Sequence, residues 1–118
     1  MTTPDPQSGE RLVRRFWDEI INAQMIGVVD DLMSHDYRQY ADGIAQGPEG
    51  LKAFLRETFE ASEGMRAEIH DIVSTGEIVV SRTTIRFDSP PPGWATEQTI
   101  VDIFRTDGVR LTEHWDMR

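Results

Sequence analysis

The clearest indication of the fold is the C-terminal run Thr99-Ile-Val-Asp-Ile-Phe-Arg-Thr-Asp-Gly-Val-Arg-Leu-Thr-Glu-His-Trp-Asp-Met-Arg118. Two β-prone segments flank Asp107-Gly108, and an Asp-Gly pair between such segments is a strong hairpin signal. In the first segment Asp102 shares a strand face with Ile100 and Phe104, because successive side chains alternate. A carboxylate on such a face is unusual, since burying its charge is costly unless the group is paired or protonated. The hairpin therefore forms either the floor of a pocket or one half-exposed sheet.

The second segment of this hairpin divides its side chains in the same way. Alternation predicts one polar face, with Thr112, His114 and Asp116, and one apolar face, with Leu111, Glu113, Trp115 and Met117.

Charge and composition exclude several classes of function. The chain has 118 residues, 21 acidic against 12 basic side chains and a formal net charge of -9. This length predicts a single domain over residues 1–118, with residues 1–8 as a flexible tail. The negative charge argues against nucleic-acid and anionic-membrane partners, because both need a basic surface.

Cysteine is absent, which excludes a disulfide framework, a thiol nucleophile and a cysteine metal site. The N-terminal run MTTPDPQSGE lacks the basic start and apolar core of a signal peptide, and no segment is apolar enough to span a bilayer. We expect a soluble cytoplasmic protein.

Hydrophobic periodicity changes from helical to strand-like near Met65. The expected order is a helix capped by Ser8 and ending at Asn22-Ala23, a short helix over 25–33, a strand over 36–41, a helix from Pro48 to Gly64, strands over 66–74 and 77–87, a loop over 88–93 and the C-terminal hairpin. This order predicts an α+β fold with helices packed on one face of a curved, mainly antiparallel sheet. Trp94, after the proline-rich loop, is a candidate for closing over a pocket; an exposed or loop-packing tryptophan is the alternative.

The run VDIFRTDGVRLTEHWDMR resembles the C-terminal hairpin of SnoaL-like domains, which belong to the nuclear transport factor 2-like superfamily. That superfamily includes small polyketide cyclases, ketosteroid isomerases, limonene-epoxide hydrolases and non-catalytic binding modules. The resemblance implies a cone-like fold, in which three helices from the N-terminal half pack on the sheet and enclose a pocket.

The resemblance also implies candidate site residues. Asp116 falls where the cyclases have an acid/base aspartate and the epoxide hydrolases a catalytic aspartate. Asp102 falls where ketosteroid isomerases place a protonated aspartic acid. Tyr37 and Gln39 match the strand from which epoxide hydrolases position a water, and Arg82 matches an arginine of those hydrolases.

Other positions depart from these patterns. Thr84 stands where the hydrolases have a second aspartate, so that their relay is incomplete. Ala41 stands in place of the isomerase general base, and Trp17 in place of its tyrosine. The expected catalytic residues are Asp116, Asp102 and His114, and the expected substrate-binding residues are Trp17, Tyr37, Gln39, Arg82, Thr84 and Phe104.

Each of these residues also has a structural interpretation. Asp116 or Asp102 is alternatively a structural carboxylate, paired with Arg82 or bonded to a backbone group. His114 is alternatively a packing residue. His35 and His70 have no ligand-like spacing, so we expect neither a metal site nor a cofactor.

The leading functional hypothesis is acid/base chemistry beside a carbonyl, such as aldol-type cyclisation or isomerisation of a polyketide-like or other hydrophobic substrate. Asp116 would move the proton, and Asp102, held neutral in an apolar setting, would donate to the enolate oxygen together with Gln39 or Tyr37. The alternative is a non-catalytic small-ligand-binding or assembly module. An epoxide or other hydrolase comes third.

A homodimer is expected from the sheet. The face with Leu111, Trp115 and Met117, or the one with Ile85 and Phe87, is too apolar to be freely solvated if helices cover only one side.

Overall fold

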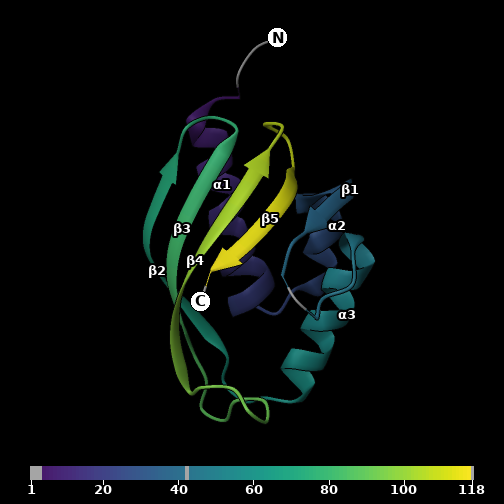
Figure 1. The fold of residues 1–118 in the computed structure, drawn as a ribbon, viewed down its shortest axis with the longest axis vertical. Coiled ribbons are helices and arrows are strands. Elements are labelled where there is room, and N and C mark those ends of the chain that lie inside the picture. The colour runs from purple at the N-terminus through teal and green to yellow at the C-terminus, as the bar shows by residue number, and fades with distance from the viewer. Residues whose placement is uncertain (1–3, 42, 118) are drawn as a thin grey trace.

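In the part of the chain that the computed structural model describes, residues 4–41 and 43–117, three α-helices cover one face of a five-stranded sheet (Figure 1). Side chains are described for all of these residues except Met117. The strands follow the order β1-β5-β4-β3-β2, in which β1 runs parallel to β5 and all other neighbours are antiparallel. The predicted α+β fold, with helices on a mainly antiparallel sheet, is confirmed.

The first helix, α1 (Pro6–Arg15), begins earlier than the sequence indicates. Asp5, not Ser8, is its N-cap, and the Asp5 side chain accepts a hydrogen bond of 2.9 Å from the backbone N–H of Gln7. Proline at the first helical position has a suitable φ and needs no hydrogen-bond acceptor. Part of the expected tail is therefore helical, and residues 1–3 lie outside the described residues.

After Arg15 the helix widens into the π-helical segment η1 (Phe16–Asn22). The predicted apolar stripe of Phe16, Trp17, Ile20 and Ile21 is buried here. The wider turn of a π-helix brings residues four and five apart onto one face, and short π-helical segments are frequent at functional sites. The side chain of Asn22 then exchanges two hydrogen bonds with the backbone of Ala67 in the sheet.

Three shorter elements join this helix to the third one. The 3-10 turn η2 (Ile26–Val28) and α2 (Val29–Leu32) lie within the predicted helix over 25–33. Strand β1 (Met33–Gln39) begins three residues before the predicted strand, and α3 (Gly47–Glu60) ends before Gly64.

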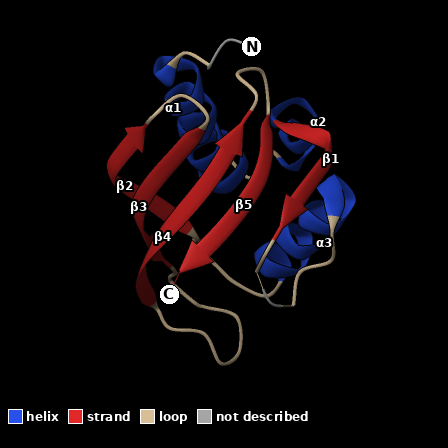
Figure 2. Cartoon of the chain, turned by 45° about the horizontal axis from the view of Figure 1, so that its top comes forward, coloured by secondary structure: helices blue, strands red, loops and turns tan. Residues whose placement is uncertain are grey.

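The other four strands are β2 (Arg66–Ser74), β3 (Ile78–Arg86), β4 (Glu97–Thr106) and β5 (Leu111–Met117). Helices and sheet form two layers, and the β3–β4 loop extends from one end of the sheet (Figure 2). An isolated bridge between Glu63 and Ser89 fixes the start of this loop, and a hydrogen bond of 2.9 Å from the N–H of Phe87 to the carbonyl of Thr96 closes its base.

The alternation predicted for β5 is wrong at its first residue. Leu111 is completely buried in the core, whereas Trp115 stacks on Tyr40 with ring centroids 4.9 Å apart. A register shift between Arg105 and Thr106, opposite the start of β5, places Leu111 on the inner face. A bulge adds one residue to one strand, and each added residue reverses the facing of the side chains beyond it.

The apolar face that predicted a homodimer is therefore differently composed. Ile85 and Phe87 are also core residues under the helices, and Met117 lies outside the described side chains. The outer face instead carries Val80, Val101, Ile103 and Trp115, all half-buried on the central strands. Within the described residues, no helix has the length and apolar character needed to cross a membrane.

Candidate active site

A cavity of about 90 Å³ lies between the inner face of the sheet and the helices. Its walls are mostly apolar and come from every layer of the fold: Phe16 and Trp17 from η1, Phe54 and Leu55 from α3, and Ile85 and Ile100 from the sheet. Its polar side chains include Gln39, Asp102, His114 and Asp116. Ligand sites typically combine such an apolar wall with a small number of placed polar groups.

Two carboxylates face each other on the floor of the cavity. Asp102 on β4 and Asp116 on β5 are directly opposite in the strand register, and both line the cavity. Opposite residues of an antiparallel pair have Cβ atoms about 4.5–5.5 Å apart, a separation at which two negative charges repel. The two carboxyl groups have different environments, because Asp102 is 1% exposed while Asp116 is half-buried.

His114 is held between β4 and β1. Its Nε2 lies 2.7 Å from Oδ1 of Asp102, and its Nδ1 lies 3.3 Å from the hydroxyl of Tyr37. Phe104 stacks on the imidazole with a centroid distance of 4.4 Å and an interplanar angle of 1°. The ring is thus fixed in position and in plane, and Asp102 and His114, two of the three residues expected to be catalytic, are in direct contact.

Tyr37 lies behind the cavity floor, where it is 1% exposed. Burial raises the pKa of its phenol above the usual value, and the carboxylates of Asp102 and Asp116 raise that pKa further. Tyr37 is therefore a neutral hydroxyl in the folded protein, which donates one hydrogen bond and accepts others.

Gln39 ends β1 and is tied to the following loop. Its side-chain Nε2 donates to the carbonyl of Ala45 at 2.6 Å, and its Oε1 lies 3.3 Å from the hydroxyl of Tyr37. The side-chain amide of Gln46 pairs with the backbone of Gln39, accepting from its N–H at 3.1 Å and donating to its carbonyl at 2.7 Å. Ala45 and Gln46 were not candidates from the sequence. No local pattern indicates that the side-chain amide of a loop residue forms the backbone hydrogen bonds that a neighbouring strand would otherwise form with Gln39.

Trp17 and Trp94 lie on the cavity wall. The indole N–H of Trp17 donates to the hydroxyl of Ser81 at 3.2 Å, and the ring borders the cavity. Trp94, on the β3–β4 loop, lies beside Phe54 and Phe87 with centroid distances of 6.2 and 6.0 Å. Its side chain is 37% exposed, so it borders both the cavity and solvent.

Arg82 and Thr84 lie on the opposite face of the sheet, away from the cavity. The inward residues of β3 are Val79, Ser81, Thr83 and Ile85, which are buried under the helices. Arg82 pairs with Asp71 at 2.7 Å instead of with Asp116 or Asp102. The sequence left open which face of β3 is the inner one. The structure places Arg82 and Thr84, two of the six expected substrate-binding residues, on the outer face.

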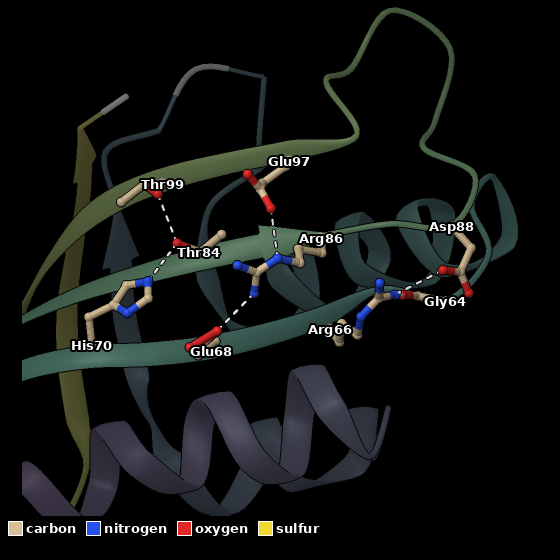
Figure 3. Close-up of polar contacts among 9 residues, drawn as sticks. All are labelled: Gly64, Arg66, Glu68, His70, Thr84, Arg86, Asp88, Glu97 and Thr99. Carbon is tan, nitrogen blue, oxygen red and sulfur yellow. Dashed lines mark hydrogen bonds and ion pairs between the residues drawn. The ribbon is translucent and has the colours of Figure 1, made fainter.

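Thr84 belongs to a polar cluster on the outer face (Figure 3). Its hydroxyl lies 2.6 Å from Nε2 of His70 and 2.8 Å from the hydroxyl of Thr99. Beside it, Arg86 pairs with Glu68 at 2.9 Å and Glu97 at 2.7 Å. In the described part of the chain, no group of three or more His, Cys, Asp or Glu side chains is arranged to hold a metal ion.

Comparison with known families decides the relationship. The model of the SnoaL-like domain matches residues 13–114, which is most of the sequence. The chain belongs to the SnoaL-like domain family. None of the curated proteins matches it significantly.

Solved structures similar to this SnoaL-like domain share its fold at low sequence identity. TsrD from Streptomyces laurentii has a TM-score of 0.82 and 23% identity, over 96% of this chain and 89% of that one. A protein described as a SnoaL-like polyketide cyclase from Jannaschia sp. CCS1 has a TM-score of 0.82 and 20% identity, over 99% and 89% of the two chains. An LEH-like epoxide hydrolase from M. tuberculosis has a TM-score of 0.75 and 21% identity, over 98% of this chain and 81% of that one. At these identities the similarity shows the fold alone.

Proposed function

We propose that this SnoaL-like domain is a cofactor-independent enzyme that moves a proton beside the carbonyl of a hydrophobic small molecule. The observation that carries the proposal is the pair of facing carboxylates, Asp102 and Asp116, at the floor of an otherwise apolar cavity. Two carboxyl groups with different surroundings are suited to opposite roles in proton transfer. The SnoaL-like polyketide cyclase among its structural neighbours agrees with chemistry of this class.

Asp116 is the proposed proton acceptor. It is the more exposed of the two carboxylates and lines the cavity, so that it is available to a carbon acid bound there. The electrons released from the C–H bond move to the carbonyl oxygen and form an enolate. Transfer to that oxygen of the proton held between Oδ1 of Asp102 and Nε2 of His114 converts the enolate to an enol and leaves the pair with one proton fewer, so these two residues act as the general acid.

Hydrogen–deuterium exchange at the carbon next to a carbonyl tests Asp116 as the proton acceptor, and the test does not require the natural substrate to be known. The probe is 2-tetralone, a small cyclic ketone, incubated in D2O with the wild type and with Asp116→Asn. We expect the wild type to accelerate exchange, and Asp116→Asn to reduce this acceleration at least about a hundredfold, because a general base contributes about that much or more. Binding, followed as a thermal shift, should be nearly unchanged in the variant.

A non-catalytic ligand-binding module is the second candidate, and one observation favours it. Both ring nitrogens of His114 are engaged by protein side chains, which is also what a rigid binding pocket requires. In that case 2-tetralone or a similar ketone would raise the melting temperature of the protein. The ketone would exchange deuterium equally slowly in the presence of the wild type and of Asp116→Asn. A hydrolase using Arg82 and Thr84 receives no support, since both lie on the outer face.

We also propose that two copies pair through the outer face of the sheet. The half-buried side chains of Val80, Val101, Ile103 and Trp115 form an apolar strip on the outer face of the sheet, which no helix of the described residues covers (Figure 1). Ion pairs such as Arg82–Asp71 and Arg105–Glu113 border this strip. An apolar centre with a polar rim is typical of a protein–protein contact.

A further inference from the structure

The orientation of the Gln39 amide is determined by a loop carbonyl. A backbone carbonyl only accepts hydrogen bonds, and the carbonyl of Ala45 lies 2.6 Å from the terminal atom of the Gln39 side chain. That terminal atom must therefore be the NH2 group, since two acceptors at this distance would repel each other. The carbonyl oxygen of the same amide, Oε1, consequently points to Tyr37.

The amide in turn determines the direction of the Tyr37 hydroxyl. A neutral phenol has one proton, which it can place in only one hydrogen bond. Oε1 of Gln39 has no proton and needs a donor, and both side chains are 1% exposed, so water is largely excluded. Tyr37 therefore donates to Gln39 at 3.3 Å, and its oxygen has only lone pairs left for His114.

We infer that Gln39 is a positioning residue that fixes a proton on Nδ1 of His114. Nδ1 lies 3.3 Å from a Tyr37 oxygen that can only accept there, so Nδ1 must carry the hydrogen. The hydrogen-bonded chain runs in one direction, from His114 through Tyr37 and Gln39 to the carbonyl of Ala45. Gln46 supports this chain by holding the backbone of Gln39 with two further hydrogen bonds.

This inference changes the roles expected for Tyr37 and Gln39. The single proton of the Tyr37 hydroxyl and one of the two N–H groups of the Gln39 amide are committed inside the protein, so these protons are not available to a substrate oxygen. With Nδ1 protonated, the exchangeable proton is the one between Nε2 of His114 and Oδ1 of Asp102, 2.7 Å apart, at the floor of the cavity. The assignment of these protons to their atoms does not depend on a catalytic role, whereas their use in catalysis rests on the proposed function.

Nitrogen NMR of the full chain tests the assignment directly. In protein labelled with 15N-histidine at pH 7, we expect Nδ1 of His114 to show a directly bonded proton. His35 is an exposed histidine of the same chain and provides an internal reference for an imidazole in water. A wild-type His114 whose Nδ1 has no proton would overturn the inference.

Two variants test the chain of hydrogen bonds that imposes this state. In Gln39→Met the amide is replaced by an apolar side chain of similar length, so Tyr37 is released to donate to His114, and Nδ1 should lose its proton. Tyr37→Phe removes the acceptor for Nδ1 and should have the same effect. Tyr40→Phe is the matched control, because the Tyr40 hydroxyl donates to Glu113 at 2.8 Å, and this variant should leave His114 unchanged.

The result separates this inference from the proposed enzymatic role. A protonated Nδ1 that responds to Gln39→Met, in a protein that does not accelerate deuterium exchange, would support the positioning role and reject the catalysis. A Gln39→Met variant that folds and retains the Nδ1 proton would refute Gln39 as the residue that positions it.

Discussion

At the scale of single residues, the buried contact between Asp102 and His114 is expected to contribute to stability. Asp102 is 1% exposed, and its side chain lies 2.7 Å from the imidazole. Any acid/base role of Asp102 would also depend on this contact with His114. A carboxylate in this position is maintained by its partner, because an unpaired buried charge is strongly unfavourable.

Asp102→Asn should therefore destabilise the protein. Asparagine retains an acceptor for Nε2 but no charge, so we expect a loss of about 1–3 kcal/mol in the free energy of unfolding at pH 7. Asp71→Asn is the control, since it breaks the exposed pair with Arg82 and should cost at most about 1 kcal/mol. Urea unfolding of both variants measures the difference. An unchanged or increased stability of Asp102→Asn would instead indicate that Asp102 is neutral in the folded protein.

Tyr37 predicts a loss of stability at alkaline pH. Burial raises the folded pKa of its phenol above the unfolded value of about 10. The stabilisation is fully present below the unfolded pKa and declines as the pH rises above it, because only the unfolded chain then releases the proton. Above pH 10 this group alone should lower the free energy of unfolding by about 1.4 kcal/mol per pH unit. Tyr37→Phe should show a shallower decline between pH 10 and pH 11, and identical slopes would contradict the assignment.

At the scale of elements, the β3–β4 loop is held against the start of β2. Gly64 has φ of 66°, and a Cβ at this position would lie 2.1 Å from Oδ2 of Asp88. Arg66 also pairs with Asp88 at 3.1 Å and donates to the carbonyl of Gly64 at 2.7 Å (Figure 3). These contacts fix the segment that carries Trp94 on the cavity wall.

Gly64→Ala should destabilise this region by more than its backbone strain alone. A left-handed conformation costs a non-glycine residue about 1–2 kcal/mol, and displacement of Asp88 adds to that cost. Gly93→Ala, in the β3–β4 loop, is the matched control, because φ is 85° but no atom lies within 4 Å of the added Cβ. Thermal unfolding should show a larger decrease in melting temperature for Gly64→Ala than for Gly93→Ala. Equal decreases would show that contact with Asp88 contributes nothing.

At the scale of the whole molecule, the sheet has helices on one face and none on the other within the described residues (Figure 2). The inner face is occupied by the core and the cavity, so association through the sheet must use the outer face. Ile103 is central there, because it lies opposite Val80 on one side and Trp115 on the other.

Light scattering at micromolar concentration should therefore give the mass of two chains. Ile103→Glu should give the mass of one chain, because it would bury a charge at the centre of the contact. Val109→Glu is the control: Val109 is 67% exposed in the β4–β5 turn, and its substitution should leave the mass unchanged. A wild-type monomer would refute pairing through this face.

The sequence by itself determined the fold class and the apolar setting of Asp102. These features depend on local periodicity. Residue spacing alone predicts the buried stripe from Phe16 to Ile21 and the alternation of Ile100, Asp102 and Phe104. Resemblance of the final hairpin to SnoaL-like domains agreed with the family whose model matches residues 13–114.

Only the tertiary structure decided which groups meet. The register shift before Leu111, the inner face of β3, the contact of His114 with Asp102 and the pairing of Gln46 with Gln39 depend on strand register and on loop closure. A shift of one residue reverses every side chain of a strand without changing its composition, so Arg82 and Ser81 were equally plausible as inner residues. Contacts across layers involve residues far apart in the chain, and local spacing contains no information on their distance.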